Sequence, residues 1–261
     1  MAATRIEMET KDGVAWITLD GPETRNALDA RASEALIAAC DRIDADPEVG
    51  AAVITGTGRA FCSGADTDVL ASLRSARADE GYDGLDVLYA GFRRFAGLRV
   101  PTVAAVNGAA VGAGLNLALA ADLRVMAQDA LLVSGFAAVG IHPGGGHLHL
   151  LGRAAGSTAA AAMGVFARRV RGAEAVGLGL AWAAVPAVDL HPTVRELIAH
   201  LAADPELARA LKADLRLTVL DGTAWERSVE IERARQMWSL TRRNGDKSLQ
   251  NGDNPLQSRE S

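Results

Sequence analysis

Polar and apolar residues alternate at the start of the chain. Ile6 and Met8 have polar neighbours, and a second run rich in strand-forming side chains covers residues 14–19. The two runs are separated by a turn that contains Asp12 and Gly13. An Asp-Gly pair between two such runs is typical of a β-hairpin. The pattern therefore predicts that the chain opens with two antiparallel strands.

A helical periodicity follows the predicted hairpin. Leu36, Cys40 and Ile43 recur at three- and four-residue spacing, which places them on one face of a helix. Asp29 precedes this segment and has a side chain suited to accept hydrogen bonds from the free N–H groups of the first turn. The helix is expected to end before Pro47.

Two short apolar runs, residues 51–55 and 102–106, have the pattern of strands buried on both faces. Each leads through a glycine-rich turn into a helical segment. Strands that alternate with helices in this way predict a layered α/β architecture.

The pattern of polar and apolar residues changes after about residue 190. Helical segments without strands follow, and Ile231, Ala234 and Trp238 share one face of a late helix. We therefore expect a core over residues 1–190, a helical region over 191–243, and a polar, flexible tail over 244–261.

Composition narrows the class of protein. The 261 residues carry a formal net charge of −5, which argues against nucleic acid as a partner. The two cysteines, Cys40 and Cys62, make no disulfide framework, and the first residues lack the apolar segment of a signal peptide. No apolar stretch reaches the roughly 20 residues that span a bilayer. We expect a cytoplasmic protein without a membrane partner.

Two glycine-rich turns, within residues 56–66 and 107–114, suit a ligand with negative charge. Small residues at the entrance to a helix leave backbone N–H groups unpaired and accessible. Two such donors from different turns could form an oxyanion hole. Close packing between strand and helix also explains such turns. Pyrophosphate binding, as in a nicotinamide-dependent dehydrogenase, is a further alternative, but the G-x-G-x-x-G spacing is absent from the second turn.

Four segments resemble, in order and approximate spacing, the signature blocks of the crotonase (enoyl-CoA hydratase/isomerase) superfamily. They are residues 18–28 (TLDGPETRNAL), 58–66 (GRAFCSGAD), 106–114 (VNGAAVGAG) and 121–124 (ADLR). The resemblance covers residues 5–185. It implies a spiral of ββα units followed by a helical C-terminal oligomerisation region, and a homotrimer or homohexamer. The helical part also carries more large apolar residues than a small lobe needs for its own core, which is consistent with an oligomer.

The resemblance also implies which residues bind substrate. The backbone N–H groups of Ala65 and Ala113 take the positions that hold a thioester oxygen. A coenzyme A (CoA) thioester is the implied substrate, and no permanently bound cofactor or metal is expected. The implied substrate- and CoA-binding residues are Arg25, Ala27, Ser63, Ala65, Asp66, Thr67, Asp68 and Ala113.

The sequence departs from the family pattern at the catalytic carboxylates. Hydratases of this superfamily carry two glutamates that hold and split water, and the matching positions here are Asn116 and Phe136. Neither side chain exchanges a proton near neutral pH. General acid–base catalysis typically contributes about 10²- to 10⁴-fold, so we expect poor hydration of a simple enoyl-CoA.

A substitute for the glutamates can be sought in the histidines of the next segment. His142 precedes Pro143 at a predicted helix entrance, where an imidazole could reach the pocket and act as a base. A loop histidine bonded to backbone is the alternative. His147 and His149 lie on different faces of the following helix, and we expect at least one to be packed or solvated. The three histidines match no zinc signature.

Two further places could supply a catalytic group. Residues 71–86 correspond to the variable wall of the acyl pocket and are expected to form a mobile loop with solvated charges, of which one could point inward. These charged and polar residues are Asp79, Glu80, Tyr82, Asp83 and Asp86. Cys62 could be a nucleophile, but no histidine can be placed beside it from the sequence, so we expect a small packed thiol.

These observations predict a protein that binds a fatty or aromatic acyl-CoA and stabilises its enolate at the oxyanion hole. The reaction would lie in the hydratase/isomerase range and use an atypical acid–base group. A non-catalytic acyl-CoA binding or carrier protein is the main alternative, and a nicotinamide-dependent dehydrogenase is the third.

Overall fold

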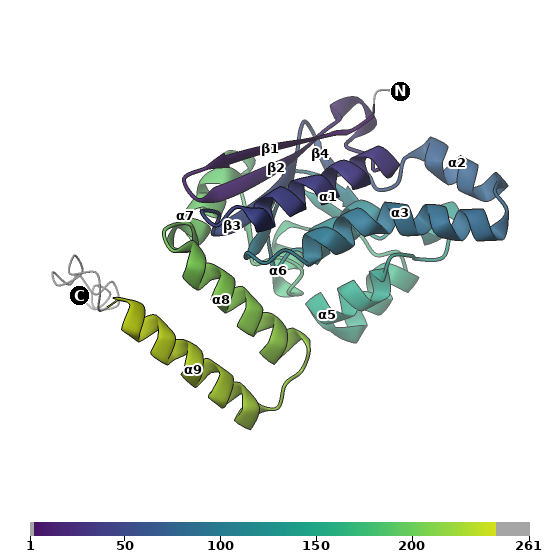
Figure 1. Cartoon of the computed structure of the whole chain (residues 1–261). Coiled ribbons are helices and arrows are strands. Elements are labelled where there is room, and N and C mark those ends of the chain that lie inside the picture. Colours follow the sequence, from purple (N-terminus) through teal and green to yellow (C-terminus); the bar gives the residue numbers. More distant parts are fainter. Residues whose placement is uncertain (1–2, 244–261) are drawn as a thin grey trace. The chain divides into compact units, whose positions relative to one another are not determined.

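The computed structural model describes residues 3–243 (Figure 1). The chain divides into two compact units, residues 1–209 and 210–261. The tail expected at 244–261 lies outside the described residues. No described helix is both long enough and apolar enough to span a membrane.

A six-stranded sheet forms the frame of the first unit, in the order β1-β2-β3-β5-β7-β10. β1 and β2 are antiparallel, and the remaining neighbours pair in parallel. Its strands are β1 (Arg5–Lys11), β2 (Val14–Asp20), β3 (Ala51–Gly56), β5 (Thr102–Val106), β7 (Leu123–Ala127) and β10 (Ala183–Val185). β3 and β5 are buried almost throughout, as their continuous apolar runs predicted.

The predicted hairpin is confirmed. β1 and β2 are joined by Asp12 and Gly13, which both have positive φ, at 50° and 73°. Such a turn matches the right-handed twist of the two strands.

A smaller sheet lies beside the first, in the order β4-β6-β8-β9. β4, β6 and β8 pair in parallel, and β9 is antiparallel to β8. Its strands are β4 (Ala60–Cys62), β6 (Ala109–Val111), β8 (Leu131–Val133) and β9 (Val170–Arg171).

The chain passes from one sheet to the other in repeated strand–strand–helix units. In each unit the first strand joins the six-stranded sheet and the second joins the smaller sheet, and one or two helices follow. The units are β3-β4-α2-α3, β5-β6-α4 and β7-β8-α5. This arrangement confirms the expected spiral of ββα units.

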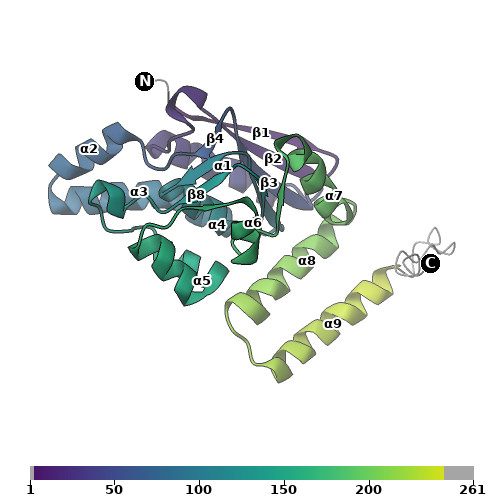
Figure 2. The same ribbon diagram turned by 180° about the vertical axis from the view of Figure 1, so that it is seen from behind.

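Helices cover the sheets. α1 (Ala30–Ala45) begins as predicted at Asp29, whose side chain accepts a 2.7 Å hydrogen bond from the N–H of Ala32. Its buried face contains the predicted apolar residues and packs beside α3 (Figure 1). The short α4 is buried along its whole length and packs against α3 and α5 (Figure 2). The bounds are α2 (Thr67–Ser75), α3 (Ala78–Ala96), α4 (Ala113–Ala120), α5 (His147–Ala160) and α6 (Gly172–Gly177).

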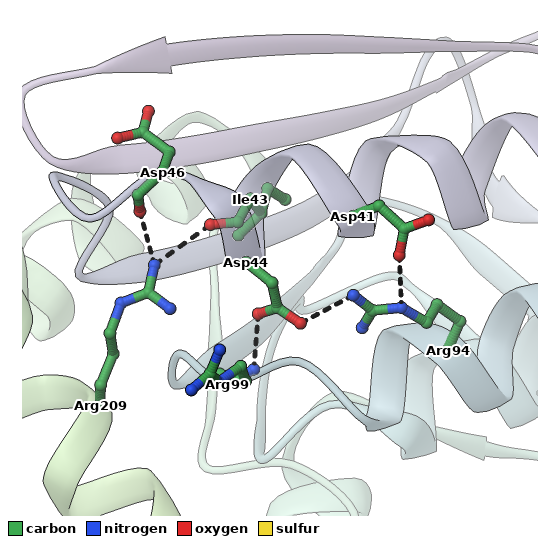
Figure 3. Close-up of polar contacts among 7 residues, drawn as sticks. All are labelled: Asp41, Ile43, Asp44, Asp46, Arg94, Arg99 and Arg209. Carbon is green, nitrogen blue, oxygen red and sulfur yellow. Dashed lines mark hydrogen bonds and ion pairs between the residues drawn. The ribbon is translucent and has the colours of Figure 1, made fainter.

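Three arginines, Arg94, Arg99 and Arg209, hold the C-terminal half of α1 in place (Figure 3). Arg94 of α3 donates hydrogen bonds to Asp41 and Asp44 of α1, at 2.9 and 2.7 Å. Asp44 also accepts a 2.9 Å bond from the backbone N–H of Arg99. The guanidinium of Arg209 donates to two carbonyl oxygens at the end of α1, and thereby satisfies acceptors that a helix end leaves free.

The helix that follows residue 190 packs on the six-stranded sheet of the first compact unit, which ends at residue 209. α7 (Leu190–Ala202) buries Leu190, Val194 and Ile198 in one apolar cluster with β2, β3, β5 and β7. Because this helix completes the other face of the six-stranded sheet, it belongs with the core.

The helical part continues beyond α7 with α8 (Pro205–Leu215) and α9 (Trp225–Arg243). Short 3-10 and π-helical turns complete the chain at Pro22–Thr24, Ala137–Val139, Ala161–Val165, Ala187–Asp189 and Arg216–Leu220. On α9, Ile231 and Trp238 are half-buried, but Ala234 of the same predicted face is exposed. Large apolar side chains remain exposed in the second unit, including Trp225, Met237 and Leu240.

Candidate active site

Three parallel strands of the smaller sheet end at one edge, and a candidate site lies there. Ser63 and Gly64 follow β4, Gly112 follows β6, and Ser134 follows β8. Because the carboxyl ends of parallel strands meet at the same edge of a sheet, these three segments become neighbours. Ligands of open α/β sheets commonly bind at such an edge.

The turns after β4 and β6 pack directly on each other. Gly64 has φ of +94°, and a Cβ built on it would lie 2.7 Å from the carbonyl oxygen of Val111 and 3.4 Å from the backbone N of Ala113. A side chain at position 64 would therefore push the two turns apart. The sequence suggested two donor turns but could not show that they meet.

Two backbone amides lie at this junction. Ala113 is the first residue of α4, where an N–H group has no partner within the helix. Ala65 follows Gly64 and forms an isolated bridge with Leu28 through its neighbours' N–H and C=O groups. Among the described residues, neither the Ala65 nor the Ala113 amide donates a hydrogen bond. Both residues line the same cavity.

The cavity has a volume of about 280 Å³ and a mainly apolar lining. The strand ends form its floor, and α2 and α3 contribute Leu70, Leu85, Leu88 and Tyr89. No Asp or Glu of the described chain lines it. Burial raises the pKa of Tyr89, so the phenol stays protonated at neutral pH.

The wall segment is helical rather than a loop. Most of residues 71–86 lie in α2 and α3, and the charged and polar side chains that the sequence suggested there are all exposed. The amphipathic pattern of α3 explains the difference, because Leu85, Leu88 and Tyr89 face inward while the acidic residues face outward.

The residues expected to bind CoA divide into two groups. Ser63, Ala65, Thr67 and Ala113 line the cavity. The others do not. Arg25 is exposed beside the site, and its carbonyl oxygen accepts a 2.9 Å bond from the N–H of Ser63. Ala27 is buried, Asp66 caps α2 through a 2.8 Å bond from the N–H of Asp68, and Asp68 is exposed.

The two positions matched to the family glutamates both border the cavity. Asn116 lies one turn after Ala113, is fully buried, and donates a 3.0 Å hydrogen bond from Nδ2 to the carbonyl oxygen of Gly144. Phe136 is half-buried, and its ring meets the ring of His147 edge-on, with centroids 4.8 Å apart.

The three histidines have different environments. His142 lines the cavity, is otherwise exposed, and its Nδ1 lies 2.8 Å from the carbonyl oxygen of Pro143. His149 is exposed on α5, whereas His147, at the start of that helix, is 1% exposed. No group of three or more His, Cys, Asp or Glu side chains in the described range could hold a metal ion.

His147 connects two residues of the cavity floor. Its Nδ1 lies 2.6 Å from Oδ1 of Asn116, and its Nε2 lies 2.7 Å from Oγ of Ser134. Burial lowers the pKa of His147 to about 4, so the ring is neutral at pH 7. Sequence reasoning favoured His142 and missed Ser134. No local pattern marks Ser134, because its hydrogen-bond partner, His147, lies 13 positions away in the sequence.

Cys62 does not face the cavity. Its side chain is completely buried, and burial raises the pKa of its thiol to about 12. It therefore lacks both the thiolate and the access that a nucleophile needs.

The chain is similar to known proteins in sequence and in fold. The model of the enoyl-CoA hydratase/isomerase family matches residues 9–250. A Mycobacterium tuberculosis protein named "Probable enoyl-CoA hydratase echA14" is 44% identical over 211 residues, which cover 80% of each chain. A Rhodobacter capsulatus protein named "Probable enoyl-CoA hydratase" is 41% identical over 214 residues, again 80% of each. The crystal structure of an enoyl-CoA hydratase from Polaromonas sp. JS666 matches with a TM-score of 0.83 and 28% identity, over 92% of this chain and 93% of that one.

Proposed function

The chain belongs to the enoyl-CoA hydratase/isomerase family, and from that premise we propose that it binds an acyl-CoA thioester and stabilises its enolate. The thioester oxygen would accept hydrogen bonds from the backbone N–H groups of Ala65 and Ala113. One observation carries the proposal. Two amides without partners, from turns that pack on each other, border one apolar cavity.

Backbone donors suffice for this part of the chemistry. Negative charge develops on the thioester oxygen when a proton leaves the α-carbon, and two fixed N–H groups stabilise that charge without reorganisation. The N-terminus of α4 adds the positive end of its dipole. Loss of both family glutamates leaves these donors unaffected.

For the acid–base group we propose His142. A carbonyl oxygen can only accept, so the Pro143 carbonyl requires that Nδ1 of a neutral His142 carry the proton. Nε2 then holds a lone pair and can take a proton from the acyl group. A single base can move a proton between two carbons, whereas hydration also needs a group that holds water. The reaction would therefore be isomerase-like, and hydration would be slow.

A non-catalytic acyl-CoA binding or carrier protein is the alternative, and the lack of a carboxylate in the cavity lining favours it. A nicotinamide-dependent dehydrogenase has no such support. Exchange of the α-protons of an acyl-CoA with D₂O, followed by NMR, separates an enzyme from a carrier. Calorimetric titration with a non-hydrolysable thioether analogue of acyl-CoA and with NAD separates both from the dehydrogenase.

The histidine assignment has its own test. His142→Ala should reduce α-proton exchange and the turnover of a 3-enoyl-CoA by about 10²- to 10⁴-fold, as loss of a general base does. His149→Ala, an exposed histidine seven positions later, is the matched control and should change neither. Exchange that is equally fast in His142→Ala would refute the role of His142.

We further propose that the CoA moiety is a substrate group rather than a bound cofactor. Its pyrophosphate would pass the exposed guanidinium of Arg25, and Thr67 would lie at the cavity mouth, near Asp66, Asp68 and Ala27. Arg25→Ala should then weaken binding of the thioether analogue at low salt, and the loss should shrink as salt screens the charge. Equal affinities of the parent and Arg25→Ala for the analogue at low salt would show that Arg25 does not contact the CoA moiety.

We also propose a homotrimer or homohexamer. Trp225, 77% exposed, and the exposed Met237 and Leu240 of α9 support this, because a helix with such side chains commonly covers a neighbouring chain. Light scattering at micromolar concentration should give three or six times the chain mass. A stable monomer would contradict the proposal.

A further inference from the structure

Ser134, His147 and Asn116 form a continuous hydrogen-bonded series at the floor of the cavity. The two bonds to the imidazole measure 2.7 and 2.6 Å. All three side chains are at most 3% exposed, yet Ser134 and Asn116 line the cavity and His147 lies behind them. The function proposed above, whose base is His142, leaves this series unused.

The direction of every bond in the series follows from one backbone carbonyl. The oxygen of Gly144 can only accept, so the group of Asn116 that faces it must be the NH₂ of its side chain. The Asn116 oxygen therefore faces His147 and accepts from Nδ1–H. Because the ring is neutral, Nε2 carries a lone pair.

The hydroxyl of Ser134 completes the series. Nε2 of His147 can only accept in this tautomer, so the Oγ–H of Ser134 donates to it. The proton on Oγ thus already points at a base, which is the arrangement that activates a serine for nucleophilic attack.

The position of Ser134 places this hydroxyl beside the proposed oxyanion hole. β6 and β8 pair in parallel with Val111 opposite Val133, and the N–H of Gly112 donates a 3.0 Å bond to the carbonyl oxygen of Val133. Ser134 and Gly112 are therefore adjacent strand ends. Ala113, which carries one of the two free amides, is the next residue.

We propose that Ser134 is a nucleophile and that the protein hydrolyses an acyl-CoA thioester through an acyl-serine. The inference rests on the thioester binding proposed above but adds a hydrolase activity to it. His147 is the general base, and Asn116 is a positioning residue that holds the imidazole in the required tautomer.

The chemistry balances with water as the only co-reactant. Oγ of Ser134 bonds to the thioester carbon while its proton passes to Nε2 of His147, and the oxygen becomes an oxyanion held by the Ala65 and Ala113 amides. When the tetrahedral intermediate collapses, the C–S bond breaks and the imidazolium returns the proton to the sulfur of CoA. A water molecule then attacks the carbonyl carbon of the acyl-serine and gives a proton to His147. When the C–Oγ bond breaks, the imidazolium returns that proton to Oγ, which releases the carboxylic acid and restores Ser134.

The test measures thiol release from crotonyl-CoA and benzoyl-CoA with a thiol-reactive dye, on the full chain in its native assembly. Ser134→Ala and His147→Gln should each reduce the release rate by at least 100-fold. Ser157→Ala and His149→Gln are matched controls, because these residues are exposed on α5 and belong to no part of the site. Both controls should keep the parent rate within twofold.

A second measurement covers variants that fold poorly. Intact-mass and peptide mass spectrometry of the parent, quenched during turnover, should show an acyl adduct on the peptide that contains Ser134. Ser134→Cys keeps the size of the side chain and should show a longer-lived adduct on the same peptide.

The outcomes separate the two proposals. If the thioether analogue does not bind, acyl-CoA binding is wrong and the hydrolase inference falls with it. If the analogue binds and α-protons exchange but no thiol is released, only the hydrolase inference is overturned. Thiol release that survives in folded Ser134→Ala, with no adduct in the parent, would also overturn it, since water would then attack without the serine.

Discussion

Oδ1 of Asn116, the residue that the sequence resemblance matches to a family glutamate, accepts a 2.6 Å hydrogen bond from Nδ1 of His147. Asn116→Leu would remove this acceptor and free the proton to move to Nε2, where it blocks the base. We expect kcat for thiol release to fall by at least 100-fold with little change in KM, because a wrong tautomer in related relays costs about 10⁴-fold.

Asn116→Asp tests the same residue in the opposite direction. A carboxylate beside Nδ1 would favour the imidazolium and raise the pKa of His147, so the acid limb of the pH profile of kcat should move from near pH 4 toward neutral pH. If Asn116 had only a structural role, Asn116→Asp would change the free energy of unfolding but would leave the acid limb of the kcat profile near pH 4.

Loss of one oxyanion donor should reduce every reaction that passes through a thioester oxyanion. Ala113→Pro removes the N–H at the first position of α4, where proline fits the helix. One such donor is worth about 2.7–4 kcal/mol, so α-proton exchange and thiol release should fall by about 10²- to 10³-fold. Ala113→Gly keeps the N–H and should stay near the parent rate. Equal rates in a folded proline variant would refute the oxyanion hole.

The parent should hydrate crotonyl-CoA at a small fraction of a hydratase rate, because Asn116 and Phe136 cannot deprotonate water. Asn116→Glu combined with Phe136→Glu should raise hydration, and thiol release should fall because the longer side chain at position 116 no longer places an acceptor at Nδ1 of His147. Each single change should raise hydration much less, because groups that act as a unit are not additive. Chromatographic assay of 3-hydroxybutyryl-CoA and free CoA measures both products.

Two outcomes would contradict the low hydration rate expected of the parent. Brisk hydration of crotonyl-CoA by the unmodified protein would contradict it. If the same rate were lost in His142→Ala, the imidazole would have taken over the role of the missing glutamates.

The buried His147 should make stability depend on pH. Burial lowers its pKa from 6.5 to about 4, so the unfolded chain binds this proton first as pH falls. The contribution is fully present above pH 6.5 and is lost progressively between pH 6.5 and 4. It amounts to on the order of 2 kcal/mol, allowing for water in the adjacent cavity. Urea unfolding of the parent should show a free energy of unfolding that falls as the pH is lowered from 6.5 to 4. If His147→Gln shows the same dependence of this free energy on pH, the assignment to His147 is contradicted.

Arg94 should stabilise the core more than its neighbour Arg93. Arg94 is 26% exposed and bonds to Asp44, which is 13% exposed, whereas the Arg93–Asp86 pair is 64% and 63% exposed. Removing one member of a partly buried pair leaves the other without compensation. We expect Arg94→Ala to cost about 1–2 kcal/mol and Arg93→Ala less than about 0.5 kcal/mol in urea unfolding. Equal costs would show that burial of the pair is immaterial.

The elements that follow local rules could be predicted from the sequence. The Asp12-Gly13 hairpin, the cap at Asp29 and the buried strand β5 depend on residues close together in the chain. The amphipathic face of α3 was missed, and with it the wall contributed by Leu88 and Tyr89, because the acidic residues of that segment resemble a solvated loop. The family blocks supplied the order of the ββα units.

The sequence by itself determined the strands, the two glycine turns and the absence of glutamate at positions 116 and 136. The tertiary structure alone decided that the turns meet and that His147 bonds both Ser134 and Asn116. The register of the parallel strands β4, β6 and β8, together with the position of the first turn of α5, brings these groups together from segments up to 31 positions apart. Hydrogen bonds reach only about 3 Å, so such pairings depend on packing that no local pattern of residues encodes.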